Sequence, residues 1–154
     1  ETRLLSSLVI HSNHPRELDH GVATALQRLR GSGVTLLNQA VLLAGINDSA
    51  EVLGHLSERL FECGVLPYYL HQLDRISGAA HFAVSDRRAC ELQRTLMATL
   101  PGYLVPKLVR ETPDAPHKVP VAGDAPQIDV TAVTKTAPTH NDPNGGYRDS
   151  DGAV

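Results

Sequence analysis

The sequence contains very few residues of the kinds that build disulfide frameworks or iron–sulfur sites. It has two cysteines, one methionine and no tryptophan in 154 residues. Two cysteines exclude a dense disulfide scaffold and are too few for a three-cysteine cluster motif, so any iron–sulfur ligands must lie outside this chain. Cys63 and Cys90 both fall in helix-like patterns, and we expect them to be buried free thiols rather than metal ligands.

Long hydrophobic runs and an excess of one charge are also missing. The longest apolar runs, at residues 4–10 and 34–37, are far shorter than the roughly 20 residues of a membrane helix. The first residues lack the features of a signal peptide. Residues 1–118 hold 12 acidic and 12 basic side chains, which leaves no basic face for nucleic acid. We therefore expect a soluble, cytoplasmic protein with neither membrane nor nucleic acid as a partner.

Short apolar segments recur along the first 118 residues and have the features of buried strands. They cover residues 4–10, 34–43 and 65–70, and an extended segment interrupted by proline follows at 103–109. Runs of this length, bounded by glycine, proline, histidine or asparagine, are typical of strands in a parallel sheet.

Between these segments, apolar residues recur at three- and four-residue steps, which indicates amphipathic helices. The helices are predicted at residues 18–29, 48–60 and 85–100. Val22 and Leu29 are expected on the apolar face of the first helix. Asp48 and Glu51 resemble a capping box, which would start the second helix at Asp48.

Strands alternating with helices through short connections predict parallel βα units and an α/β fold. Three such strands make a small sheet, whereas eight-stranded barrels of this kind need about 250 residues. We therefore interpret residues 1–118 as the carboxy-terminal part of a barrel whose first strands lie outside this chain. The strand edge and apolar strand faces left open by the missing part predict association or poor solubility of the isolated chain.

The composition changes at residue 119. Residues 119–154 are rich in alanine, proline, glycine, threonine and aspartate and contain few large apolar groups. Such a segment cannot bury enough surface to offset the entropy of ordering, so a disordered, low-complexity tail is predicted.

Polar residues form three clusters, two at the ends of predicted strands and one within a strand. The clusters are residues 11–14, the pair Asn38 and Gln39, and residues 71–74. Ligands of parallel βα folds bind at the carboxyl ends of the strands, so these clusters are the candidate binding residues.

Each cluster also has a structural interpretation. His11 and His14 suit a metal by residue type, as in a metal-dependent hydrolase, but no acidic partner completes the ligand set. The sequence favours a histidine hydrogen-bonded within the loop, and hydrogen bonding to a polar ligand is the further alternative. Asn38 and Gln39 are either bonded to neighbouring backbone, or one of them points at a ligand in the mouth of the barrel.

Six motifs occur in register with one known family. They are HSNHPREL at 11–18, GVTLLNQAVLL at 33–43, GIND at 45–48, GVLPYYLHQLD at 64–74, GAAHF at 78–82 and PGYLVPKLVRE at 101–111. In the residues of these motifs and in their order, the sequence resembles the lysine 2,3-aminomutase family, and in particular its elongation factor P branch. The resemblance covers about residues 1–120.

The resemblance implies a partial (βα)6 radical S-adenosylmethionine barrel that binds S-adenosylmethionine, a [4Fe-4S] cluster and pyridoxal phosphate. In that family the cluster cleaves S-adenosylmethionine to a radical that removes a hydrogen from lysine, and pyridoxal phosphate carries the migrating amino group. The arginines that bind the cofactor phosphate and the substrate carboxylate would lie upstream of this chain.

Three residues are matched to the reaction itself. By resemblance, Lys118 is the lysine that binds pyridoxal phosphate covalently, with Lys107 as the alternative because the glycine-rich approach to this lysine is altered here. Asp74 and Glu111 match the carboxylates that bind the ε-ammonium of the substrate. From sequence pattern alone, Asp74 would be a loop carboxylate and Lys118 a surface lysine.

Further cofactor contacts are matched on the strands. His11 and Gln39 correspond to positions that contact the methionyl end of S-adenosylmethionine. Asn38 is retained as a neighbouring cofactor candidate. His71 stands where the aminomutases proper tend to have tyrosine, and it is expected to face the cofactors.

The resemblance thus predicts part of an isomerase that interconverts (S)-α-lysine and (R)-β-lysine for modification of elongation factor P. Its partners would be L-lysine and, indirectly, elongation factor P and its ligase, and the full-length protein would be a homo-oligomer. Without a cluster-binding segment the chain alone is expected to be inactive. The alternative is a non-catalytic remnant that binds pyridoxal phosphate or a partner.

Overall fold

The computed structural model describes residues 4–74, 78–113 and 115–122. Five strands form one sheet in chain order: β1 (Ser7–His11), β2 (Thr35–Leu42), β3 (Leu66–Gln72), β4 (Lys107–Arg110) and β5 (Val119–Pro120). The first four are mutually parallel, and β5 is antiparallel to β4. This arrangement confirms the predicted α/β class with a parallel sheet.

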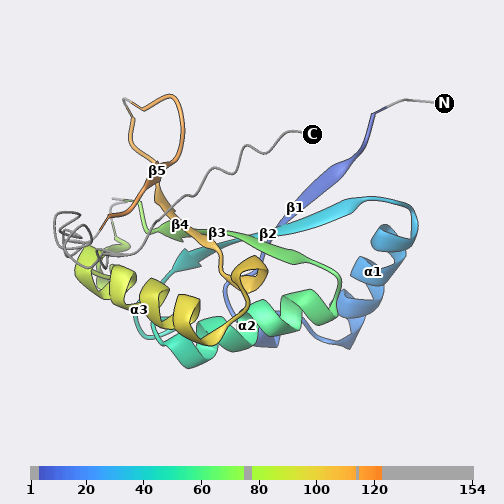
Figure 1. The fold of residues 1–154 in the computed structure, drawn as a ribbon, viewed down its shortest axis with the longest axis horizontal. Helices are drawn as coiled ribbons and strands as arrows, with labels where there is room; N and C mark the ends of the chain where they lie inside the picture. The colour runs from blue at the N-terminus through green and yellow to red at the C-terminus, as the bar shows by residue number, and fades with distance from the viewer. Residues whose placement is uncertain (1–3, 75–77, 114, 123–154) are drawn as a thin grey trace, which may run out of the picture. The chain divides into compact units, whose positions relative to one another are not determined.

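Three α-helices pack on one face of the sheet (Figure 1). They are α1 (His20–Gly31), α2 (Ala50–Glu62) and α3 (Asp86–Thr99). Three single turns of 3-10 helix also occur: η1 (Pro15–Glu17), η2 (Ala80–Phe82) and η3 (Gly102–Leu104). The opposite face of the sheet, which we call the open face, carries none of these α-helices.

Each α-helix begins at a side chain that accepts a hydrogen bond from the first turn. In each helix the residue just before it accepts a hydrogen bond from the N–H of the third helical residue. These capping residues are Asp19 for α1, Ser49 for α2 and Ser85 for α3. The predicted start of α2 at Asp48 is therefore wrong by one residue. The Asp48 carboxylate instead accepts the N–H of Gly45 at 3.0 Å and closes the preceding turn.

The hydrophobic core lies between the sheet and the helices. Alternate residues of β2 enter it, and Leu42 of β2, Leu70 of β3 and Leu96 of α3 are fully buried. In α1 the core contacts come from Ala23 and Leu26. Val22 and Leu29, which were predicted to be inward, are each 38% exposed. Since α1 lies at one end of the row of helices (Figure 1), part of its apolar face has no helix beside it.

Strand β1 forms one edge of the sheet in the part of the chain that the structure describes. It pairs with β2 and has no second strand beside it. Leu8 and Val9 of β1 are 38% and 43% exposed, on opposite faces of the strand. An open edge with exposed apolar side chains is the expected property of a barrel segment without its first strands.

The pairing of β2 with β3 contains a bulge. Asn38 pairs with Pro67, and the next residue, Gln39, pairs with Tyr69. Tyr68 is therefore an extra residue in β3. A bulge of this kind interrupts the ladder and increases the local twist.

The ordered sheet extends beyond the predicted end of the domain at residue 118. Val119 and Pro120 form β5 by pairing with Arg110 and Val109. The first residues assigned to the tail thus belong to the sheet. The remainder of the predicted disordered segment, residues 123–154, lies outside the described residues.

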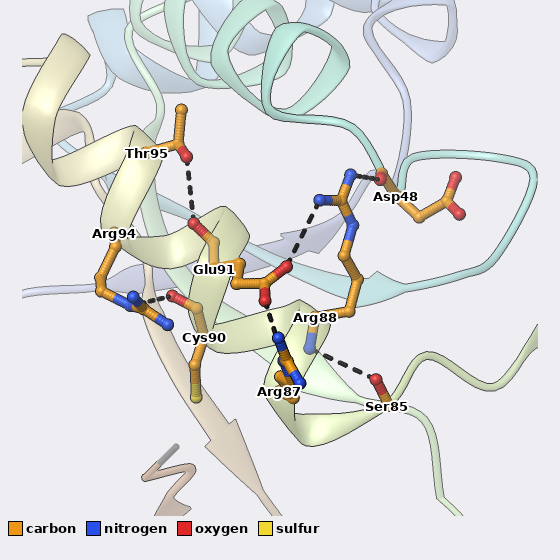
Figure 2. A network of polar contacts seen from close by, with 8 residues as sticks. All are labelled: Asp48, Ser85, Arg87, Arg88, Cys90, Glu91, Arg94 and Thr95. Carbon is orange, nitrogen blue, oxygen red and sulfur yellow. Dashed lines mark hydrogen bonds and ion pairs between the residues drawn. The ribbon is translucent and has the colours of Figure 1, made fainter. Parts of the chain in front are cut away.

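Polar contacts attach the amino end of α3 to the rest of the fold (Figure 2). Arg87 and Arg88 both pair with the Glu91 carboxylate, at 3.2 and 3.7 Å. Arg88 also donates to the backbone carbonyl of Asp48 at 3.3 Å, in the loop before α2. These contacts fix the end of α3 that lies nearest to the carboxyl ends of the strands.

Among the described helices, none has the length and apolar character needed to span a bilayer.

Candidate functional site

A row of polar side chains crosses the open face. His11 of β1 pairs with Gln39 of β2, Gln39 with Tyr69 of β3, and Tyr69 with Lys107 of β4. Paired residues of parallel strands project to the same side of the sheet. The alternate residues of β2, including Asn38, are buried against the helices, so Gln39 and its partners face the open side.

A second group lies at the carboxyl ends of β3 and β4. The Glu111 carboxylate forms an ion pair and hydrogen bond with the Lys118 ammonium, and its Oε1 is 3.9 Å from His71 Nδ1. The Lys118 Nζ lies 5.6 Å from the centroid of the Tyr69 ring, and that ring makes an edge contact with His71 at 5.7 Å. Three of the predicted site residues are thereby brought together.

His71 is the most buried member of this group, with 8% of its surface exposed. Burial lowers the pKa of its imidazole below the ordinary value, and the Lys118 charge lowers it further, against weaker opposing effects of Glu111 and Asp74. Its Nε2 is buried and has no hydrogen-bond partner among the described atoms. A neutral imidazole with an unused nitrogen is suited to bind a polar ligand group.

The lowered pKa predicts how stability depends on pH. Below the ordinary value of 6.5, unfolded His71 takes up a proton that the buried ring resists, so the free energy of unfolding should fall as the pH drops from 6.5. Urea denaturation at a series of pH values between 5 and 8 measures this slope. The slope should become smaller in His71→Gln and stay unchanged in His55→Gln, which alters an exposed histidine on α2. An identical slope in both variants would contradict the prediction.

Glu111 shows the reverse electrostatic situation. The hydrogen bond and charge of Lys118 hold the pKa of this carboxyl below its ordinary value. Glu111 is therefore ionised throughout the neutral range. Its side chain is about half exposed, so solvent screens the pair and its contribution to stability is small.

Asp74 and Glu111 line the same cavity. The cavity has a volume of about 800 Å³ and lies at the carboxyl ends of β3 and β4, beside the start of α3. Arg110 and Asp86 also line it, but these two form an ion pair with each other. Asp74 and Glu111, whose charge is shared with Lys118, are the remaining carboxylates that line this space.

Asp86 is a residue that sequence reasoning missed, and Gln72 was included only as a member of the polar cluster at residues 71–74. The Gln72 amide donates to Asp86 Oδ1 at 2.9 Å and to the Val84 carbonyl at 3.1 Å. Together with the Arg110–Asp86 pair, these bonds join the ends of β3 and β4 to the start of α3. The position of Gln72 between two candidate site residues is the only signal that the sequence offered.

Asn38 does not face the open side, which corrects its assignment as a cofactor ligand. It is 2% exposed, its Oδ1 accepts the Ser12 N–H at 2.9 Å, and its Nδ2 donates to the Ser12 carbonyl at 3.0 Å. Both ends of the amide are used, which is the structural interpretation that the sequence left open. Gln39 is the amide of this pair that is placed to meet a ligand.

A second asparagine contact, also missed, fixes the loop after β1. Asn47 is completely buried; its Nδ2 donates to the carbonyls of Asn13 and Val41, both at 2.8 Å, and its Oδ1 accepts the N–H of Leu43 at 2.7 Å. Asn13 Oδ1 in turn accepts the Val41 N–H at 2.7 Å. These bonds hold the loop that follows His11 against the end of β2.

His14 has a local structural role. Its Nδ1 accepts the N–H of Arg16 at 3.1 Å and caps η1. The described parts of the chain contain no group of three histidine, cysteine or carboxylate residues that could hold a metal ion. Cys63 and Cys90 are buried and free, as predicted.

The described residues fit two of the three expected cofactors. Lys118 offers a partly exposed amine beside an aromatic ring and the unpartnered His71 nitrogen, which suits an aromatic aldehyde such as pyridoxal phosphate. His11 and Gln39 offer neighbouring polar groups for the methionyl end of S-adenosylmethionine. The buried cysteines Cys63 and Cys90 do not fit an iron–sulfur cluster.

The sequence is closely related to known enzymes over most of its described length. L-lysine 2,3-aminomutase of Haemophilus influenzae is 52% identical over 118 residues, which are 77% of this chain and 35% of that protein. L-lysine 2,3-aminomutase of Escherichia coli is 53% identical over 114 residues, 74% of this chain and 33% of that protein. The chain belongs to the lysine 2,3-aminomutase family. It spans about a third of the length of these relatives.

A more distant relative also matches the chain, and one solved structure shares its fold. L-lysine 2,3-aminomutase of Clostridium subterminale is 38% identical over 111 residues, 72% of this chain and 27% of that protein. A radical SAM methyltransferase from Sphaerobacter thermophilus superposes with a TM-score of 0.52 over 68% of this chain and 33% of that chain, at 19% identity. The second likeness concerns the fold alone. No family model matches the sequence.

Proposed function

We propose that this chain is the substrate-binding and pyridoxal phosphate-binding part of a longer lysine 2,3-aminomutase, which interconverts (S)-α-lysine and (R)-β-lysine. The observation that carries the proposal is that Lys118, Glu111 and His71 meet at one end of the sheet, while Glu111 and Asp74 line one cavity. The proposed cofactor lysine is thus paired with one of the two carboxylates, and both carboxylates line the cavity. In the proposal, β-lysine serves the modification of elongation factor P, and the longer protein is a homo-oligomer.

Each residue has a definite task in this reaction. Asp74 and Glu111 bind the ε-ammonium of lysine, and a substrate without that charge would leave both carboxylates uncompensated. Lys118 provides the amine for covalent attachment of pyridoxal phosphate, which supplies the electron sink for amino-group migration. His11 and Gln39 orient S-adenosylmethionine, and the neutral His71 contributes its free nitrogen to the bound ligands.

Among the described groups of this site, His71 is the one shielded from water. It is 8% exposed, and the Tyr69 ring makes an edge contact with it at 5.7 Å. The Asp74 and Glu111 carboxylates are solvent-exposed, so solvent screens each of them and their attraction for an ammonium depends on two charges acting together. In the proposal the site therefore selects lysine by its charge.

The proposal is tested by the activity of the longer protein that includes this chain. With S-adenosylmethionine, pyridoxal phosphate and a reductant, it should convert L-lysine to β-lysine, detected by chiral chromatography. Asp74→Asn should lower kcat/KM for lysine about 30-fold, the equivalent of about 2 kcal/mol for a lost charged hydrogen bond.

Two controls separate a specific effect from a general one. Glu58→Gln changes an exposed carboxylate on α2 and should leave kcat/KM unchanged. Asp74→Asn should also reduce the discrimination between lysine and norleucine, its uncharged analogue. Absence of β-lysine formation by the wild-type protein would end the proposal, and undiminished discrimination in Asp74→Asn would remove Asp74 from the site.

A further inference from the structure

The Glu111 carboxylate has one oxygen engaged and one oxygen free. Oε1 is bound to the Lys118 ammonium and lies 3.9 Å from His71 Nδ1. Oε2 makes no polar contact with any described residue. An ionised carboxylate can accept from several donors, so this group has capacity for a second cation.

Glu111 lies between the cavity and the Lys118 side chain. It lines the cavity together with Asp74, whereas Lys118 is not among the described residues that line the cavity. Lys118 therefore approaches the carboxylate from the sheet side, beside the Tyr69 ring. A ligand in the cavity approaches it from the other side.

We propose that Lys118 and a primary ammonium ligand in the cavity compete for the charge of Glu111, so that loss of the positive charge on Lys118 strengthens ammonium binding. With Lys118 charged, Glu111 is already neutralised and Asp74 alone attracts the ligand. With Lys118 uncharged, both carboxylates act on it. The inference rests on the proposed function, because it concerns the same ammonium site.

The competition would impose an order on binding. Modification of Lys118 by an aldehyde changes the nitrogen that Glu111 binds, and the carboxylate then becomes available to the amine. The coupling between the two events is reciprocal, because it is a difference of binding free energies. An amine bound in the cavity would equally weaken the hold of Glu111 on Lys118.

His71 does not replace Lys118 as the competing cation at neutral pH. Burial, assisted by the charges of Lys118 and His11, lowers the pKa of His71 and keeps its ring neutral there. Arg110, the nearest guanidinium along the chain, is paired with Asp86. Within the described part of the chain, Lys118 is thus the cation that occupies Glu111.

The test is the binding of n-butylammonium to the full chain and its variants at pH 7.5 and low salt, followed by the NMR shifts of the side-chain carboxyl carbons. Lys118→Met removes the charge and keeps a long side chain, and it should bind the probe about fivefold more tightly, at the lower end of couplings between linked sites. Lys118→Arg retains the charge and should bind as the wild type does. The gain in Lys118→Met should shrink at 0.5 M salt.

Two further variants separate failure of this inference from failure of the proposed function. Asp74→Asn should weaken binding in every background, and Glu111→Gln should abolish the gain caused by Lys118→Met. If Asp74→Asn weakens binding but Lys118→Met gives no gain, the competition is refuted and the ammonium site stands. If Asp74→Asn has no effect on probe binding in any background, the ammonium site itself is refuted. Circular dichroism of each variant verifies that the fold is retained.

Discussion

Replacing Lys118 by alanine is expected to abolish covalent attachment of pyridoxal phosphate to the chain. The amine of Lys118 lies beside Glu111, His71 and the Tyr69 ring, whereas the other lysine of the described sheet, Lys107, lies over the Tyr68 ring at 5.4 Å. Of these two described lysines, Lys118 is the one with a carboxylate partner, and that carboxylate lies 3.9 Å from His71 Nδ1. Incubation with pyridoxal phosphate, reduction with borohydride and peptide mass spectrometry would identify the modified lysine.

The matched control is Lys107→Ala, which leaves the Lys118 group intact. It should retain the modified peptide at the wild-type level, while Lys118→Ala should lose it. Modification that disappears in Lys107→Ala and persists in Lys118→Ala would transfer the cofactor role to β4. Modification of both variants at other amines would indicate non-specific reaction of the aldehyde.

Replacing Asn47 by alanine is expected to lower the free energy of unfolding by about 3 kcal/mol. The change removes three hydrogen bonds of a completely buried amide. It leaves the Leu43 N–H and the Asn13 and Val41 carbonyls short of a partner, and each buried unsatisfied group costs roughly 1 kcal/mol or more. Urea denaturation followed by circular dichroism measures the difference.

Asp48→Ala provides the comparison at the neighbouring position. It removes one exposed hydrogen bond to Gly45 and should cost less than about 1 kcal/mol. Asn47→Asp keeps the acceptor for Leu43 but places a carboxylate oxygen against the Asn13 and Val41 carbonyls in a completely buried site, so it should destabilise the fold at least as much as Asn47→Ala. Equal stability of Asn47→Ala and Asp48→Ala would contradict the role assigned to Asn47.

The order of elements could be predicted because each has a local signature. Period-three and period-four apolar spacing located all three helices, and short apolar runs located the parallel strands. The predicted capping box failed at Asp48 because two neighbouring residues, Asp48 and Ser49, can both cap. The choice depended on the turn at Gly45, which needs the Asp48 carboxylate.

The site could be predicted only in part. The family resemblance proposed Lys118, Glu111 and Asp74 as site residues. The structure pairs Lys118 with Glu111 and places Glu111 and Asp74 on one cavity, while the roles of all three stay predictions. The sequence could not decide between Asn38 and Gln39, because adjacent residues of a strand face opposite sides and the phase depends on pairing. Asn47 received no separate prediction, because its contact with Asn13 spans 34 residues of sequence and leaves no trace in the local pattern.

The extra residue Tyr68 in β3 changes which face of the sheet each later residue of the strand points to. Leu66 and Pro67 precede Tyr68 in one alternation, and Tyr69 to Gln72 follow it in the other. If Tyr68 paired with Gln39 instead, the residues after it would change faces: the His71 imidazole would turn inward among leucines and Leu70 would lie on the open face. The bulge, rather than the identity of any residue after it, therefore decides which side chains the strand presents to a ligand. Deleting the codon for Tyr68 removes the unpaired residue and should keep Gln39 opposite Tyr69, so it should leave His71 on the open face.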